Sequence, residues 1–154
     1  MNSSFEIIKK PRIHSINLIK DLSIEQLNNI PAGFNNNIIW NIAHTIAAQQ
    51  GVCYKRAGLD IRVDEDFFQR YKPDTKPTDF IDSAEVEKIS ELLLTTIDQL
   101  ETDYNNELFS NYTSWTTRYG VEINNIDKAI NFLPFHEGLH FGYVMALKRA
   151  VANS

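Results

Sequence analysis

Residues 38–48 read IIWNIAHTIAA, and almost every side chain in this run is apolar. A helix that is apolar on nearly all sides belongs in the centre of a protein core, because no face of it suits water. We therefore predict a buried helix from about residue 36 to residue 57. The asparagines at 35–37 supply candidate N-cap residues before it, and Gly58 is a natural stop after it.

Three more segments carry apolar residues at the spacing of three or four that marks one face of a helix. They cover about residues 4–22, 83–104 and 125–152. Pro11 predicts either a kink in the first of them or its true start. Ser83 is the candidate N-cap of the next one.

Shorter elements are expected between these helices. Ser23, with Gln26 three residues later, forms a capping-box pattern before a turn at 24–30. A short helix is expected near residues 64–71. The β-forming residues around Gly120, within 112–123, favour a small hairpin.

Four helices of similar length predict an all-α fold, a four-helix bundle that forms a single domain over residues 1–154. Residues 59–82 are long enough to cross the whole bundle. The second and third helices could therefore run parallel rather than as a tight hairpin.

The composition excludes several kinds of partner. Acidic residues outnumber basic ones by 20 to 15, which gives a net charge of −5, and no Lys/Arg cluster could bind a phosphate backbone. The single cysteine, Cys53, cannot form an intramolecular disulfide. The first residues lack a signal-peptide pattern, and no run approaches the roughly 20 apolar residues that span a bilayer. We expect a cytoplasmic protein that binds neither nucleic acid nor membrane.

Three of the four histidines lie in apolar helical surroundings: His44, His136 and His140. His136 and His140 are four residues apart, so they share one helix face and could converge on one metal ion. His44 is the candidate third ligand, with small alanines beside it. The competing interpretation is that these are core histidines bound to carbonyl groups. His14, next to Arg12, is expected to be solvated.

Residues 136–140 read HEGLH, which matches the zinc-protease pattern HExxH. A zinc protease also needs a third ligand well downstream of the second histidine, and no His, Asp or Glu follows His140. We therefore do not predict a protease, and we expect Glu137 to be a surface or rim carboxylate. A catalytic role for Glu137 stays open. Gly138 and Gly142 allow either close helix packing or space for a ligand.

The run from Asn36 to His44, followed by the run from Phe135 to Lys148, resembles the DinB/YfiT-like metalloprotein superfamily, which is distinct from the DNA polymerase of the same name. The resemblance covers essentially the whole chain. It implies a four-helix bundle of up-down-down-up topology. It also implies a three-histidine site for zinc, nickel or another divalent ion on His44, His136 and His140. Homodimers, and enzymes that use low-molecular-weight thiols, are further expectations from the resemblance.

Three neutral ligands would leave a divalent ion with its full charge and an open position, as in catalytic sites. The favoured hypothesis is a metal-dependent transferase that activates an external thiol for a small-molecule substrate. A metal-dependent hydrolase is the alternative. A non-catalytic stress-response module with a structural metal, or a metal-free bundle that dimerises through its helix faces, also remains open. Asn41 and Glu137 are candidate partners of the ligands.

Overall fold

The computed structural model describes residues 3–152, and these residues are mostly helical, with one small two-stranded sheet, which agrees with the all-α prediction. The elements are α1 (Ser3–Ile19), α2 (Ile24–Asn28), α3 (Ile38–Gln49), α4 (Glu65–Tyr71), α5 (Ser83–Asn105), β1 (Trp115–Thr116), β2 (Glu122–Ile123) and α6 (Ile126–Ala152). The two strands pair antiparallel as the expected small hairpin.

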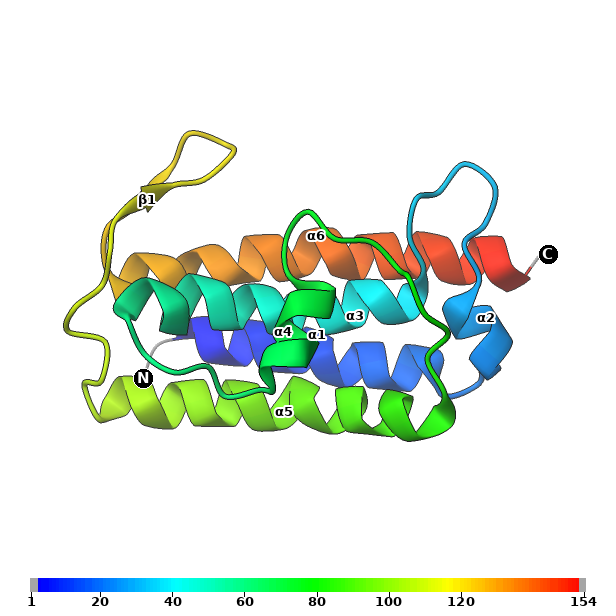
Figure 1. Cartoon of the computed structure of the whole chain (residues 1–154), viewed down its shortest axis with the longest axis horizontal. Helices are drawn as coiled ribbons and strands as arrows, with labels where there is room; N and C mark the ends of the chain where they lie inside the picture. The colour runs from blue at the N-terminus through cyan, green and yellow to red at the C-terminus, as the bar shows by residue number, and fades with distance from the viewer. Residues whose placement is uncertain (1–2, 153–154) are drawn as a thin grey trace.

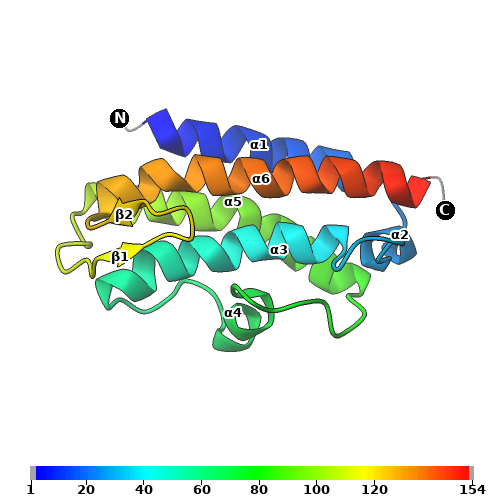
Figure 2. The same ribbon diagram turned by 90° about the horizontal axis from the view of Figure 1, so that it is seen from above.

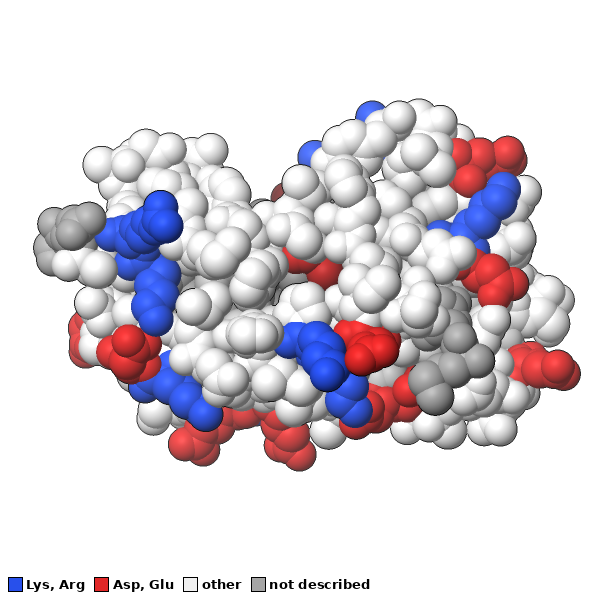
Figure 3. Space-filling view, turned by 180° about the vertical axis from the view of Figure 1, so that it is seen from behind, with Lys and Arg blue, Asp and Glu red and all other residues white. Residues whose placement is uncertain are grey.

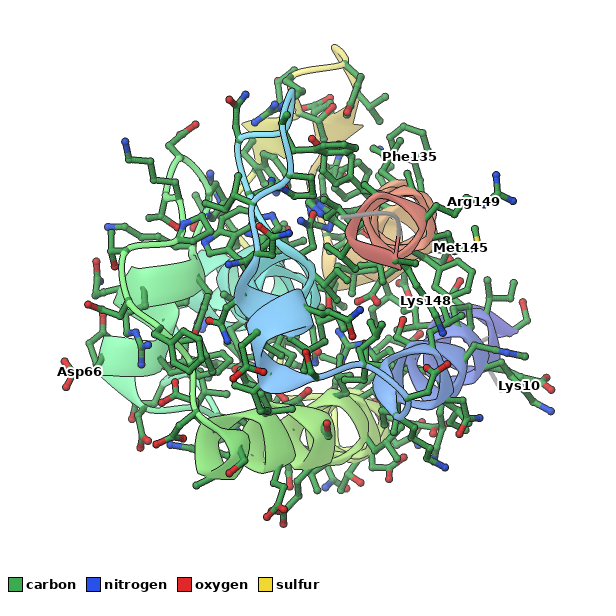
Figure 4. The ribbon with its side chains drawn as sticks, turned by 90° about the vertical axis from the view of Figure 1, so that its right-hand side faces the viewer. Lys10, Asp66, Phe135, Met145, Lys148 and Arg149 are labelled. Carbon is green, nitrogen blue, oxygen red and sulfur yellow. The ribbon has the colours of Figure 1, made fainter. Side chains whose placement is uncertain are left out.

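The four long helices α1, α3, α5 and α6 lie side by side along the long axis (Figures 1 and 2). Helices α5 and α6 each pack against both α1 and α3. The colour gradient in Figure 1 shows that α1 and α6 run in one direction and α3 and α5 in the other. Figure 4 looks along these helices from one end.

Helix α3 is buried over its whole length, from Ile38 to Gln49, as its apolar sequence predicts. Asn37 caps it by accepting a hydrogen bond from the backbone N–H of Trp40 at 2.8 Å. The helix then passes into a π-helical turn at Gln50–Tyr54 and a 3₁₀ turn at Lys55–Ala57. Gly58 ends the segment with a positive φ of 69°. The helix boundaries agree with the prediction, whereas the π turn was not predicted.

Two details of the other helices correct the sequence interpretation. Pro11 lies inside α1, which begins at Ser3, so it does not mark the start of the helix. The N-cap of α5 is Asp82 rather than Ser83, because the Asp82 carboxylate accepts from the backbone N–H of Glu85 at 2.9 Å. The capping box of Ser23 and Gln26 is confirmed.

The buried apolar residues form two clusters toward opposite ends of the helices. Between the clusters lie buried polar side chains from all four long helices, namely Arg12, His44, Thr45, Gln49, Thr96 and Glu137. Polar groups in such a layer need partners. The candidate site lies in this layer.

No helix within residues 3–152 combines the length and the apolar character needed to cross a membrane.

Candidate metal centre

The structure brings the three predicted ligands together where α3 and α6 meet. His44 lies midway along α3, and His136 and His140 lie one turn apart on α6. The centroid of the His44 ring is 5.2 Å from the centroid of the His136 ring and 4.6 Å from that of the His140 ring. One nitrogen from each ring lies within 4.8 Å of the others, so the three side chains could hold a metal ion. The helix packing of α3 on α6 creates this cluster from residues about a hundred positions apart.

His44 is held in one tautomer by α4. Its Nδ1 lies 2.7 Å from the backbone carbonyl oxygen of Tyr71, the last residue of α4. A carbonyl oxygen can only accept, so Nδ1 carries the proton and Nε2 carries the free lone pair. Trp40 stacks on one face of the ring, with the two ring centroids 4.7 Å apart and the planes inclined by 9°. The His44 ring is therefore fixed with its Nε2 available as a ligand.

His140 is held in the same way by Asn41. The Nδ1 of His140 lies 2.9 Å from Oδ1 of Asn41. The Nδ2 of Asn41 donates to the side chain of Asn36 and to the backbone carbonyl of Asn37, which fixes the orientation of the amide. Nδ1 of His140 must then donate to Oδ1, so its Nε2 is also free. Sequence reasoning singled out Asn41 beside His44, whereas its observed partner is His140.

His136 differs from the other two histidines because no group in the described part of the chain orients its ring through Nδ1. Its Nδ1 is buried and has no hydrogen-bond partner among the described residues. A buried imidazole nitrogen without a partner is costly, and a metal ion bound at this nitrogen would satisfy it. The unpartnered nitrogen and the two oriented neighbours fit a metal site, because ligating histidines usually donate their second nitrogen to a carbonyl group.

All three imidazoles are neutral near pH 7. Burial is the largest cause in each case: it lowers the pKa of His44, lowers that of His136 to about 3 and lowers that of His140 to about 4. The neighbouring imidazoles and the charge of Arg118 lower the pKa values of His136 and His140 further. Neutral imidazole is the form that binds a metal ion.

Glu137 corrects the sequence interpretation, because it is not a surface or rim carboxylate. It is 5% exposed and forms an ion pair with Arg12, which is 1% exposed. Nε of Arg12 donates to both carboxylate oxygens at 3.1 Å. With its two oxygens bound to a guanidinium, Glu137 is not placed to act as the general base of a zinc protease.

Arg12 is the residue that sequence reasoning missed. Its remaining N–H groups donate to the carbonyl of Leu93 at 2.8 Å, to Thr96 at 3.1 Å, to the carbonyl of Thr45 at 3.4 Å and to Glu137. The signal was present in the spacing, because Arg12 lies on the same helix face as Ile8 and Ser15, and all three are buried. A charged residue on a buried stripe requires a buried partner.

The other candidate residues lie outside the cluster. His14 is exposed, as expected. Gly138 and Gly142 face solvent, and a Cβ at either position would meet nothing within 4 Å, so close helix packing does not explain them. The HEGLH pattern therefore contributes only its two histidines to the site.

Comparison with known proteins agrees with this geometry. A family model of the DinB superfamily matches residues 14–144, a range that includes all three histidines. No curated protein matches the chain. The match spans most of the chain and confirms the resemblance found in the sequence. The chain belongs to the DinB superfamily.

Proposed function

We propose that this protein is a divalent-metal-dependent enzyme whose ion is held by His44, His136 and His140. The observation that carries the proposal is the convergence of three neutral imidazoles from α3 and α6, with one nitrogen of each within 4.8 Å of the others. Zinc and nickel are the proposed ions, because imidazole suits both. Three neutral ligands are the arrangement of catalytic rather than structural sites.

A bound ion would supply Lewis acidity at an open coordination position and so lower the pKa of a thiol or a water there. The protein's own residues orient the ligands. The carbonyl of Tyr71 and the amide of Asn41 hold the Nε2 atoms of His44 and His140 toward the centre of the cluster. Trp40 covers one face of His44.

We propose thiol transfer as the reaction. The thiol loses its proton to solvent, its sulfur forms a bond to an electrophilic carbon of a small-molecule substrate, and the leaving group departs with the bonding electrons. The engagement of Glu137 with Arg12 favours thiol transfer over hydrolysis, because water is a far weaker acid than a thiol and needs a general base more. Hydrolysis is the alternative reaction.

The metal is tested by elemental analysis of protein purified without an affinity tag. We expect about one zinc or nickel ion per chain in the wild type and loss of the ion in His136→Ala. His14→Ala, which removes an exposed histidine, is the matched control and should keep the ion. Equal metal content in the wild type and in His136→Ala would refute the site.

The reaction is tested by thiol conjugation to an electrophile with metal-loaded wild type and His44→Ala. Thiol transfer predicts a rate above background only for the wild type, and equal rates would refute it. Ester hydrolysis by the wild type alone would favour the hydrolase. A metal that raises the melting temperature but supports neither reaction would indicate a non-catalytic module.

We also infer that the four long helices form one four-helix bundle of up-down-down-up order and a single domain. The directions of the helices in Figure 1 and the packing of α5 and α6 on both α1 and α3 support this inference. A homodimer is the proposed assembly. Analytical ultracentrifugation would test it.

A further inference from the structure

The β1–β2 hairpin lies beside the histidine cluster. Trp115 packs edge-on against Phe132 at 6.1 Å, and Tyr119 packs edge-on against Phe135 at 5.1 Å. Phe132 in turn contacts the ring of His136 at 6.3 Å. The hairpin is thus anchored to the turn of α6 that begins the HEGLH run.

The tip of the hairpin is internally held. The backbone N–H of Thr117 donates to the carbonyl of Val121 at 2.9 Å, and the buried hydroxyl of Thr117 accepts from the N–H of Tyr119 and of Val121. Gly120 has the positive φ of 80° that this tight turn needs. Arg118 therefore projects from a fixed backbone rather than from a loose loop.

The hairpin also forms one wall of a surface hollow. In Figure 3 the molecular outline is notched between two raised parts, which Figure 1 identifies as the hairpin and the loop between α2 and α3. Helices α3 and α6, which carry the three histidines, run between these two parts in Figure 2. The hollow therefore lies beside the hairpin and over the two helices that carry the histidine cluster.

Arg118 is exposed, and within residues 3–152 no carboxylate or hydrogen-bond acceptor is paired with it. Other arginines near the core are paired: Arg12 with Glu137, Arg62 with Asp103 and Arg70 with Glu85. The charge of Arg118 acts on His44, His136 and His140, whereas the carboxylate of Asp74 acts on His44 alone. Arg118 is thus a positive charge near the histidine cluster that has no ion-pair partner of its own among the described residues.

A divalent ion on three neutral imidazoles would add two further positive charges at the same place. Like charges in a partly desolvated site favour a ligand that supplies negative charge to both. A guanidinium is also the side chain that best matches a carboxylate, which it can bind through two N–H groups.

We propose that Arg118 is a specificity-determining residue that binds a carboxylate of the small molecule whose other end reaches the metal centre. This inference rests on the proposed function, and it names the substrate class: thiols that carry a carboxylate. Neutral thiols of the same size lack the partner that Arg118 requires.

The test is a binding titration of Co²⁺-loaded protein, followed by the thiolate-to-cobalt absorption in the near ultraviolet. The probes are 3-mercaptopropionate, which carries a carboxylate, and 2-mercaptoethanol, which does not. The variants are Arg118→Gln, Arg118→Lys and the control Arg149→Gln. The control changes the net charge equally, but Arg149 lies on the outer side of α6, away from the other helices, in Figure 4. The ratio of the two dissociation constants is compared between variants, so that the different acidities of the thiols cancel.

We expect the ratio to favour the carboxylate-bearing thiol by about tenfold more in the wild type than in Arg118→Gln, as for one charge-assisted contact. Arg118→Lys should keep part of this preference, and Arg149→Gln should keep all of it. An equal ratio in the wild type and Arg118→Gln, or an equal loss in Arg149→Gln, would overturn the inference while thiol binding itself still stands.

Propionate is titrated in parallel through the visible absorption of Co²⁺, because it offers a carboxylate without a thiol. Binding of propionate that depends on Arg118, without binding of either thiol, would refute thiol transfer but support the role of Arg118. Binding of both thiols that is the same in the wild type and in Arg118→Gln would support thiol transfer but refute the role of Arg118. Protein that binds no Co²⁺ would refute both.

Discussion

Two groups of polar side chains lie next to each other midway along the four long helices, and they differ in how many of their polar atoms have a partner. The inner polar cluster consists of Arg12, Thr45, Thr96 and Glu137, and every N–H of the guanidinium has an acceptor either in this cluster or at the carbonyl of Leu93. The histidine cluster of His44, His136 and His140 has two oriented rings, and the buried Nδ1 of its third ring has no partner among the described residues. One group is satisfied by the protein itself, and the other needs something that the protein does not supply.

The two groups meet on α6, where Glu137 follows His136 directly. Adjacent positions on a helix point about 100° apart, so Glu137 reaches Arg12 on α1, whereas His136 faces His44 on α3. We expect the inner polar cluster to hold α6 in one rotation about its own axis. The same rotation turns His136 and His140 toward His44. This contrast predicts that damage to the inner cluster changes stability most, whereas damage to the histidine cluster changes metal binding.

The largest effect is expected for Glu137→Ala. It leaves the guanidinium of Arg12 buried without its carboxylate, and breaking a buried ion pair in this way costs about 3–5 kcal/mol of unfolding free energy. Urea denaturation of the metal-free protein measures this loss. The double variant Arg12→Met/Glu137→Leu should recover most of it, because no buried charge remains. A loss of unfolding free energy below about 1 kcal/mol in Glu137→Ala would show that the ion pair does not stabilise the fold.

The next effect concerns the metal. At an ion concentration of 100 to 1,000 times the dissociation constant, binding adds about 2.7–4.1 kcal/mol of stability. Each kcal/mol raises the melting temperature of a chain of this size by about 2–4 °C. A chelator should therefore lower the melting temperature of the wild type clearly.

The same chelator should leave His136→Ala unchanged, because this variant has lost a ligand. Without metal, the substitution itself should cost about 1 kcal/mol or less, since it also removes the unpartnered Nδ1. A chelator effect that is equal in both proteins would place the metal elsewhere.

A smaller effect is expected for Asn41→Ala, which removes the acceptor for Nδ1 of His140. Loss of a group that orients a ligand lowers metal affinity by about 10- to 100-fold. Competition with a chromophoric chelator measures the change. Asn36→Ala is the matched control, because it removes one acceptor from Asn41 but not the contact to His140. Unchanged affinity in Asn41→Ala would mean that packing alone orients the ring.

The sequence predicted the histidine cluster better than the inner polar cluster, and the reason is physical. His136 and His140 are detectable because a spacing of four residues places them on one helix face, and His44 because it interrupts an apolar helix. The partner of Glu137 is 125 positions away, so local spacing gives no sign of it. Arg12 could have been found only by asking why a charge lies on the buried face of Phe5, Ile8 and Ile19.

The ends of the helices are also decided by parts of the chain that local sequence patterns do not include. Asp82 and Ser83 are both good N-caps, and only the path of the preceding chain decides which residue caps α5. The π turn at Gln50–Tyr54 inserts one residue into a helical turn, and the single glycine in it, Gly51, does not by itself predict a π turn. Tyr54, the last residue of this turn, is buried and donates to the carboxylate of Asp103 at 2.7 Å, a contact that the local sequence does not reveal.

The smallest predicted effect concerns the solvent-facing side of α6, away from both clusters. Gly138 and Gly142 lie in the interior of a long helix, and neither has a positive φ nor an atom within 4 Å of the place of a Cβ. Replacing either with alanine should raise the unfolding free energy by about 0.5–1 kcal/mol, because glycine is the poorer helix former. Metal affinity should not change, since His136 and His140 point the other way. Urea denaturation and the chelator competition measure the two quantities. If Gly138→Ala weakens metal binding, then α6 must bend or shift at this point to close the histidine cluster, and the two clusters are less independent than their contacts indicate.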